Sequence, residues 1–522
     1  MWVKTSGDRE AVVDNPPHPY GRGLCALFTE RRRRMIRIII SLLAPLMLFA
    51  AVRADDDPAD LKQALALQRV MQKVIRDTEP AVACILVSRS DAYQRMARGP
   101  AKAQPGKLGG FNPKSLDFFD KDLARKLDLA DANVIPESFG SGVVIDAQGL
   151  ILTNYHVVRD ATKVFVRLPG GKSSYADIKA ADPRSDLAVL ELLTNLPGLK
   201  AITFGDAGKC SRGQFVLSLA NPFAAGFRDG QPSASWGILS NIRRRVPGTP
   251  VSEKELPRTL QQYGILLQTD ARLNLGCSGG ALLNLHGEMI GITTALAAIH
   301  GGETPGGFAL PIDASMSRII EVLKRGEEVD YGFLGVEPFP DAGNKGVIIN
   351  VIPGSPAEKK LQNRDRILKV NDMPVRELDD LFLSLGTKLA GAKITLQISR
   401  FNQVMEVKDV ELAKFYVPGK GIFSSMEPRP YFRGLRADYT SLLVQQQRTR
   451  QPILPGVLIA DVQPNSPAAK MDLKAGDIIT QVKGRPIFTP ADFYREVKGA
   501  QGPIELTLHS TNFPLPKVTL SP

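Results

Sequence analysis

The run Gly276-Cys-Ser-Gly-Gly-Ala281 holds a single serine between glycines. Glycines on both sides let the backbone turn tightly and bring neighbouring N–H groups together. Ser278 is therefore a candidate nucleophile, and the N–H groups of Gly276 and Ser278 are candidate donors to an oxyanion hole. Alone, the run also fits a glycine-rich β-turn, so a catalytic interpretation needs a base and an acid elsewhere in the chain.

A candidate base and a candidate acid both precede Ser278 in the sequence. His156, in Leu152-Thr-Asn-Tyr-His-Val-Val158, lies just past an apolar strand, where a loop could present it as a base. Asp186 stands just before Leu187-Ala-Val-Leu190, so its carboxylate can be buried at a strand entrance, accept an imidazole N–H and fix the tautomer. Asp182 is a competing acid, although Asp-Pro is also a turn former. The order His, Asp, Ser is that of chymotrypsin-type enzymes and differs from the subtilisin and α/β-hydrolase orders.

The region from residue 139 to 311 predicts an all-β domain. Short runs rich in Val, Ile and Leu alternate with turn residues, which is typical of sandwiches and barrels. The predicted strands are 81–88, 141–146, 149–153, 163–168, 187–192, 214–219, 264–268, 281–284 and 288–293. Helical spacing predicts helices over residues 58–78 and 312–324. Residues 89–137 lack strong periodicity and predict a long surface insertion with one short helix near 116–127.

An internal repeat occupies the C-terminal part. The run Gly346-Val-Ile-Ile-Asn-Val-Ile-Pro-Gly-Ser-Pro-Ala357 returns as Gly456-Val-Leu-Ile-Ala-Asp-Val-Gln-Pro-Asn-Ser-Pro-Ala468. Two copies are too few for a solenoid, which needs at least three. The repeat therefore predicts two tandem domains, joined by a Pro- and Gly-rich linker over residues 415–429.

Taken together, these segments resemble the HtrA/DegP serine proteases. The resemblance rests on Gly140-Ser-Gly-Val-Val144, Ile151-Leu-Thr-Asn-Tyr-His-Val-Val158, Asp186-Leu-Ala-Val-Leu190, Gln268-Thr-Asp-Ala-Arg-Leu-Asn-Leu-Gly-Cys-Ser-Gly-Gly-Ala-Leu-Leu-Asn284 and Gly307-Phe-Ala-Leu-Pro311. It covers about residues 60–520. It implies a mainly β fold: a chymotrypsin-like double β-barrel followed by two α/β PDZ domains. It also implies a catalytic triad of His156, Asp186 and Ser278, an oxyanion hole at Gly276 and Ser278, no cofactor, no metal and trimer-based assembly.

The nucleophile loop departs from the family pattern. The residue before the serine is usually Asn, and here it is Cys277, while Arg272 and Leu275 are also unusual. These departures bear on activation and not on the chemistry. We expect Leu273 and Ile292 to line the primary pocket, which predicts cleavage after small or medium aliphatic residues.

The PDZ resemblance adds a second type of site. In the first copy, Phe333, Leu334, Gly335 and Val336 look like a loop that cradles a peptide C-terminal carboxylate while the peptide adds a strand to a sheet edge. The matching stretch of the second copy is Phe432-Arg-Gly-Leu435, in which the arginine replaces an apolar residue. Either copy could instead serve packing or oligomerisation, the second more readily than the first.

The predicted organisation follows from these features. Residues 1–54 form an N-terminal extension and signal peptide, residues 55–325 the trypsin-like domain with the 89–137 insertion, residues 331–414 the first PDZ domain and residues 430–520 the second. Cys25, Cys84, Cys210 and Cys277 match neither a disulfide framework nor a zinc pattern.

The N-terminus reads as an export signal. Arg31 to Arg34 precede an apolar run over residues 38–52 that is shorter than the ~20 residues of a membrane-spanning helix. A basic region, a short apolar region and small residues predict cleavage after Ala54 and a periplasmic or other extracytoplasmic location. An uncleaved membrane anchor is the alternative. Met35 would also make a good initiator, so residues 1–34 could be an over-extended gene start.

The distribution of charge along the sequence does not indicate a nucleic-acid-binding protein. The formal net charge is +12, but residues 1–54 hold nine Lys/Arg against four Asp/Glu, and the remaining charges are interspersed. The expected function is an endopeptidase that hydrolyses misfolded or unfolded polypeptides and whose PDZ modules bind peptide C-termini. The alternative is a proteolytically weak or inactive chaperone or scaffold on the same fold.

Overall fold

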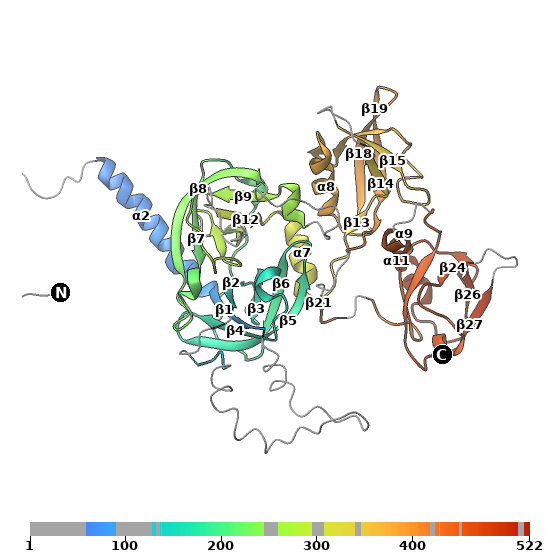
Figure 1. The fold of residues 1–522 in the computed structure, drawn as a ribbon, viewed down its shortest axis with the longest axis horizontal. Coiled ribbons are helices and arrows are strands. Elements are labelled where there is room, and N and C mark those ends of the chain that lie inside the picture. The colour runs from blue at the N-terminus through green and yellow to red at the C-terminus, as the bar shows by residue number, and fades with distance from the viewer. Residues whose placement is uncertain are drawn as a thin grey trace, which may run out of the picture. The chain divides into compact units, whose positions relative to one another are not determined.

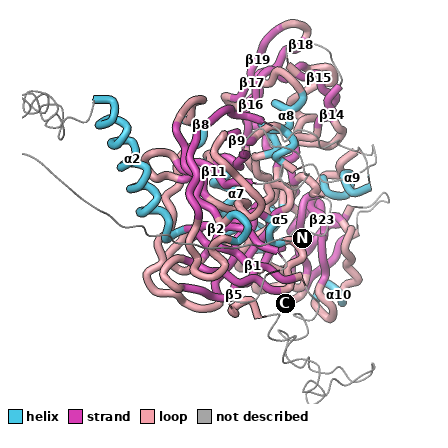
Figure 2. Tube along the Cα trace, turned by 60° about the vertical axis from the view of Figure 1, so that its left-hand side comes forward, coloured by secondary structure: helices cyan, strands magenta, loops and turns pink. Residues whose placement is uncertain are grey.

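A computed structural model describes residues 59–89, 128–131, 136, 138–244, 259–294, 307–339, 346–417, 423–426, 429–447, 452–509 and 516–522. Strands predominate in this part of the chain (Figure 2). The mainly β fold class predicted from the sequence is confirmed. The predicted signal peptide and the predicted helix near 116–127 lie outside the described residues. Among the described helices, none has both the length and the apolar character needed to cross a membrane.

The first barrel, blue to teal in Figure 1, has strand order β5-β4-β1-β2-β3-β6 and closes through β5–β6 pairing. Every residue of β1 and β3 is buried. Alternate side chains face the barrel interior, and on β1 Cys84 and Leu86 pack in a separate cluster with Leu129 and Phe165. The strands are β1 (Val82–Ser88), β2 (Ser138–Val144), β3 (Leu150–Asn154), β4 (Lys163–Leu168), β5 (Lys172–Asp182) and β6 (Leu187–Leu192).

The second barrel, green in Figure 1, is closed in the order β10-β11-β12-β9-β8-β7. Its strands are β7 (Phe215–Ala220), β8 (Ser233–Arg244), β9 (Leu266–Thr269), β10 (Ala281–Leu283), β11 (Met289–Thr294) and β12 (Gly307–Pro311). The sequence predictions match β4 and β6 to the residue but miss β5, β8 and β12. In β5 and β8, polar residues such as Lys172, Ser173, Ser233 and Ser235 interrupt the apolar pattern on the solvent side.

Two helices border the barrel strands along the sequence. Helix α2 (Ala59–Thr78) precedes β1, and helix α7 (Ala314–Lys324) follows β12. The side chain of Asp313 caps α7 by accepting from the N–H groups of Ser315 and Met316. Both helices were predicted within two residues of their ends.

The two repeats form separate sheets with separate cores. The first sheet has the order β14-β15-β16-β18-β19, from β14 (Val336–Phe339), β15 (Val347–Val351), β16 (Arg366–Val370), β18 (Lys393–Arg400) and β19 (Gln403–Glu411), with β17 (Met373–Pro374) and helix α8 (Leu378–Gly386). The second has the order β22-β23-β24-β26-β27, from β22 (Leu435–Tyr439), β23 (Val457–Val462), β24 (Ile478–Val482), β26 (Ile504–Leu508) and β27 (Lys517–Leu520). It also contains β25 (Arg485–Pro486) and the helices α9 (Ser441–Gln447), α10 (Pro467–Lys470) and α11 (Pro490–Val497).

Short strands complete the connections. Strand β13 (Gly332–Phe333) pairs with β20 (Ala413–Lys414), and β21 (Phe423–Ser424) adds to β5 of the first barrel. Residues 423–424 were predicted as part of a linker, and they are a strand because their backbone pairs with the free edge of Ala180 and Ala181.

A buried ion cluster surrounds Lys414. Its Nζ lies 2.7 Å from Asp330 Oδ1, 3.1 Å from Glu328 Oε1 and 3.2 Å from Asp438 Oδ2. Burial alone would lower the pKa of Lys414, but the three carboxylates outweigh it and hold this pKa well above its usual value. Lys414 therefore neutralises carboxylates from the segment before β13 and from β22, together with Arg429, which also pairs with Asp330 and Asp438.

Replacing Lys414 with Met should destabilise this region by about 1.5–3 kcal/mol, because it removes the ion pairs to Glu328, Asp330 and Asp438 and leaves Arg429 to neutralise the two aspartates. Native-state hydrogen exchange of residues 413–417 and 435–439 measures the loss. The exposed Lys408, paired with Glu406, is the matched control, and Lys408→Met should cost under about 1 kcal/mol. Since its pKa is raised on folding, Lys414 stabilises the fold at neutral pH and loses this effect only as the pH rises above about 10. Equal losses in the two variants would contradict this role.

Candidate active site

His156 and Asp186 meet at the ends of two neighbouring strands. His156 lies in the one-turn helix α5 (Tyr155–Val158) directly after β3, so a helical turn presents it rather than the expected loop. Asp186 immediately precedes β6 and is 5% exposed. The distance from His156 Nδ1 is 2.8 Å to Asp186 Oδ2 and 3.0 Å to Oδ1. The carboxylate thus fixes the ring by Nδ1 and leaves Nε2 for proton transfer.

The backbone holds this pair in register. Asp186 has a left-handed φ of 59°, and its carbonyl accepts from Tyr155 N–H at 3.0 Å and from the Asn154 amide at 3.1 Å. The N–H of His156 also donates to Asp186 Oδ1 at 3.0 Å. A left-handed aspartate costs free energy, which these hydrogen bonds offset.

Gln261 is a third partner that the sequence did not reveal. It lies in a 3₁₀ turn (Leu260–Tyr263), is buried, and its Nε2 donates to Asp186 Oδ2 at 2.8 Å. No motif marks this contact, since residue 261 is 75 positions from the acid. The amide limits the rotation of the carboxylate that holds His156.

Asp182, the competing acid, has a different role. Its Oδ2 accepts from the N–H and Oγ of Ser185 and from the hydroxyl of Tyr331. It therefore builds the turn that carries Asp186 and makes no hydrogen bond to His156.

Ser278 lies between β9 and β10, and Ser141 of β2 anchors its loop. The N–H of Ser141 donates to Ser278 O at 2.7 Å, and Ser141 Oγ donates to Gly276 O at 2.8 Å while accepting from Asn221 N–H at 2.8 Å. At Gly279, with φ of 89°, an added Cβ would lie 1.9 Å from Ser141 O, so only glycine fits there. The first barrel thus fixes the backbone of the candidate nucleophile, which the second barrel carries.

The third side of the triad is not closed in this structure. Within the described part of the chain, His156 Nε2 is buried and makes no hydrogen bond, so the bond to Ser278 Oγ is not formed. The two segments are nevertheless adjacent: a Cβ on Gly140 would lie 2.6 Å from Val157 and 3.3 Å from Ser278 O. Such catalytic hydrogen bonds often tighten only when substrate binds.

The loop that would form the oxyanion hole is tightly turned. Gly276 has φ of 93°, Cys277 N–H donates to Asn274 O, and Gly280 N–H donates to Cys277 O. The Cys277 side chain is 3% exposed, its Sγ accepts from Asn274 N–H at 3.3 Å, and burial raises the pKa of its thiol. This cysteine is therefore a packing element inside the loop.

The two predicted pocket residues have different environments. Leu273 is half-buried and packs against Gly307, where an added Cβ would lie 2.3 Å from its Cδ1. Ile292 is fully buried within the core, opposite Ala281 and Leu310 in the barrel.

The predicted carboxylate loop joins two elements of the first repeat. Phe333 ends β13, Val336 begins the edge strand β14, and Gly335 between them has φ of 81°. Pro338 lies two residues into β14 and has no N–H, so it cannot donate to an added peptide strand.

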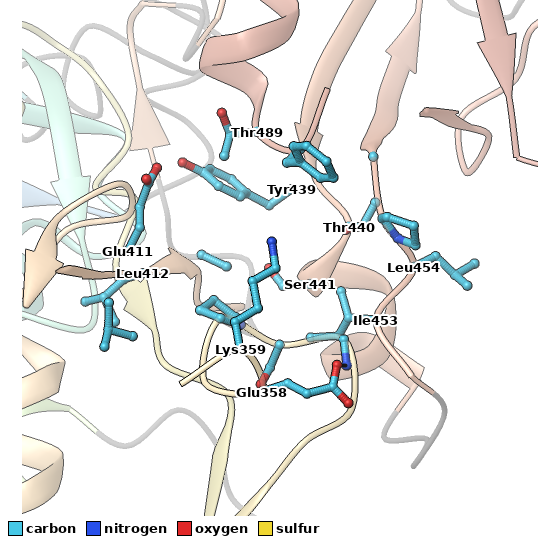
Figure 3. A pocket seen from close by; sticks show the side chains of 18 of the residues that line it. Glu358, Lys359, Glu411, Leu412, Tyr439, Thr440, Ser441, Ile453, Leu454 and Thr489 are labelled. Atoms are coloured by element: carbon cyan, nitrogen blue, oxygen red, sulfur yellow. Dashed lines mark hydrogen bonds between the residues drawn. The ribbon is translucent and has the colours of Figure 1, made fainter. Parts of the chain in front are cut away.

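A cavity of about 600 Å³ lies away from the triad. Its lining combines residues of both repeats, including Lys359, Tyr439, Ser441 and Ile453, whose side chains converge on it (Figure 3). None of the predicted catalytic or carboxylate-loop residues lines this cavity. In the described residues, no group of three His, Cys, Asp or Glu side chains is placed to hold a metal ion.

Comparison with known proteins identifies the family. A trypsin-like peptidase domain model matches residues 140–292, and PDZ domain models match residues 323–399 and 458–508. A probable periplasmic serine endoprotease DegP-like of Pseudomonas fluorescens is 31% identical over 441 residues, covering 81% of this chain and 86% of that protein. This chain belongs to the DegP family of serine endoproteases.

A second curated relative carries a similar name. The periplasmic serine endoprotease DegP of Salmonella typhimurium is 32% identical over 365 residues, covering 67% of this chain and 70% of that protein. Among solved structures, an HtrA-type protease AlgW with tripeptide is 24% identical, with a TM-score of 0.45, covering 66% of this chain and 98% of that one. As a member of this family, the chain is a serine endopeptidase with PDZ domains.

Ser141→Ala should lower kcat on a peptide substrate roughly tenfold to a hundredfold, because it removes the hydroxyl that joins Gly276 O to Asn221 N–H. KM should change little, which separates this positioning effect from loss of binding. The matched control is Ser218→Ala, since Ser218 is also buried in a strand but its side chain makes no hydrogen bond within the described part of the chain. Wild-type kcat in Ser141→Ala would contradict the anchoring role.

Gln261→Met keeps the side-chain volume but removes the donor to Asp186, and should lower kcat roughly tenfold because the acid is less well oriented. Gln262→Ala is the control, because the Gln262 side chain accepts from Thr259 N–H and, within the described residues, makes no hydrogen bond to Asp186. Steady-state kinetics measure both variants. An effect of Gln262→Ala as large as that of Gln261→Met would indicate a general disturbance of the turn.

Proposed function

We propose that His156, Asp186 and Ser278 hydrolyse peptide bonds as a catalytic triad. Ser278 Oγ attacks the scissile carbonyl carbon while His156 Nε2 takes its proton. The resulting oxyanion accepts hydrogen bonds from the N–H groups of Gly276 and Ser278. His156 then gives the proton to the leaving amine, the C–N bond breaks, and water hydrolyses the acyl-enzyme by the same route.

The observation that carries this proposal is the state of the imidazole. Asp186 binds Nδ1 at 2.8 Å, and Nε2 is buried and uncommitted next to the segment that holds Ser278. A histidine that only stabilised the fold would be expected to use both ring nitrogens when buried. The alternative of an inactive scaffold is not favoured, because the relatives are named endoproteases.

We infer further details from the family. The substrates are misfolded or unfolded polypeptides, cleaved after small or medium aliphatic residues beside Leu273, with Ile292 behind the pocket. Peptide C-termini bind at Phe333, Leu334, Gly335 and Val336. Assembly is trimer-based, without nucleic acid.

We also propose an extracytoplasmic location for the protein and boundaries for its domains. The relatives are named periplasmic, which supports an extracytoplasmic location. Export through a signal peptide cleaved after Ala54 fits this location. We propose domains over residues 55–325, 331–414 and 430–520, with residues 89–137 as an insertion.

Ser278→Ala should abolish casein degradation by the purified protein, because no other group replaces the attacking hydroxyl. The control is Ser211→Ala, since Ser211 is exposed and distant in sequence from the triad segments. Gel analysis of casein over time measures both. Undiminished cleavage by Ser278→Ala would contradict the assignment of the nucleophile.

A further inference from the structure

The loops that begin the edge strands of the two PDZ domains correspond residue by residue. In the first loop (Phe333–Val336), Leu334 O accepts from Ala357 N–H and Gly335 O from Ile352 N–H. In the second loop (Phe432–Leu435), Arg433 O accepts from Ala468 N–H and Gly434 O from Gln463 N–H. Gly335 and Gly434 have φ of 81° and 86°, and each packs on a serine, Ser355 or Ser466. Differences between the loops can therefore be read position by position.

The second loop is closed on itself. Phe432 N–H donates to Leu435 O at 2.8 Å, and Leu435 N–H donates to Phe432 O at 3.0 Å. Because Gln463 bonds to Gly434 O, Leu435 faces Val462 as a non-hydrogen-bonded pair, and its own N–H and C=O point away from the sheet. These outward groups are the ones that an added peptide strand would use. In the described residues, the first loop has no such pair between Phe333 and Val336.

The next outward donor of the same strand is also occupied. Ala437 N–H donates to Tyr494 Oη at 3.1 Å, and Tyr494 projects from α11, the helix in contact with β22. The fully buried ring of Phe493 packs edge-on against Tyr494, with 5.2 Å between the ring centroids, and holds it in place. The hydroxyl thus takes the place of a peptide carbonyl on the edge of β22.

Arg433 lies in the turn that closes the loop. It has φ of 51°, a left-handed conformation that costs a non-glycine residue free energy. Its guanidinium donates to the carbonyls of Leu520, Ala500 and Gly502, which holds the strained residue in place. The corresponding Leu334 is not among the positive-φ residues of the described chain, and it has no side-chain donor.

A side-chain site nevertheless remains beside the blocked strand. A cavity of about 530 Å³ is lined by Phe432, Tyr494 and Val497 together with the residues around Gly499. An apolar C-terminal side chain could enter it once the backbone groups of β22 were released. The second PDZ domain therefore has a peptide groove, and its own residues occupy that groove.

We propose that Arg433 and Tyr494 together occupy the peptide groove of the second PDZ domain, which leaves C-terminal peptides to the first domain. This inference rests on the proposed peptide-binding function of the PDZ modules. Arg433 closes the loop and Tyr494 caps the edge strand, so a peptide enters only when both are displaced.

Photo-crosslinking tests the proposal in the full-length chain carrying Ser278→Ala. The probe is an unstructured decapeptide with a free C-terminal valine carboxylate and a benzophenone at the third residue from its end. We expect the unaltered PDZ domains to be labelled at residues 333–339 and not at 432–439. Combining Arg433→Leu with Tyr494→Ala should add labelling of 432–439, with at least about tenfold tighter binding there.

Hydrogen exchange gives a readout that needs no peptide. In the parent chain the amides of Leu435 and Ala437 should be protected, and Arg433→Leu with Tyr494→Phe should speed their exchange about tenfold or more while residues 504–508 keep their protection. Arg436→Leu is the matched control, since Arg436 stacks on Tyr431 and should change neither readout.

Each outcome has a distinct meaning. Labelling of 432–439 in the parent, or no gain of labelling in the doubly substituted chain with intact protection of 504–508, would overturn the inference and leave the function of the first domain standing. If no variant is labelled at either loop, the peptide-binding function proposed for both PDZ domains is itself contradicted. Rapid exchange of Leu435 and Ala437 in the parent would also overturn the closure.

Discussion

The active site depends on the hydrogen bonds of one buried serine, Ser141. Its backbone N–H holds Ser278 O, and its hydroxyl bridges Gly276 O and Asn221 N–H. These bonds connect a strand of the first barrel to the nucleophile loop of the second. A base carried by one barrel and a nucleophile carried by the other can act together only if the barrels hold a fixed register, and catalysis tolerates little misplacement.

The acid is supported by a second set of contacts that reaches toward the first PDZ domain. The turn from Asp182 to Asp186 is held by the Tyr331 hydroxyl on Asp182, and Tyr331 directly precedes β13. The guanidinium of Arg184, in the same turn, stacks on Tyr331 at 4.8 Å and on Phe415 at 4.4 Å. The turn that positions Asp186 therefore packs on aromatic residues at both ends of the first repeat, whereas the buried cation Lys414 ties the following segments together.

Sequence patterns predicted much of this molecule because they reflect local physics. The strand before His156 begins with Leu150-Ile-Leu152, the strand after Asp186 begins with Leu187-Ala-Val-Leu190, and glycines mark the turn of Ser278. Ser141, Gln261 and Tyr331 were missed, because their roles arise from contacts over 75 to 149 residues along the chain and no local pattern records them. The arginine of the second PDZ loop was noticed in the sequence, yet only its φ and its three carbonyl partners explain what it does.

The two PDZ domains share one loop framework but differ in whether the edge strand is available to a peptide. Both keep the glycine, the serine beneath it and the two backbone bonds that shape the loop. Leucine at one position leaves the edge strand available, whereas arginine at the same position turns the loop back on that strand. The departures from the repeat thus carry more information about function than the repeat itself.

The most direct test of the account is the site of covalent labelling by a fluorophosphonate, which reacts with a serine activated by a neighbouring base. Mass spectrometry of the labelled full-length protein should place the adduct on Ser278 alone, and His156→Ala should prevent its formation. An adduct on a different serine, or labelling of Ser278 that is undiminished without the imidazole, would contradict the account.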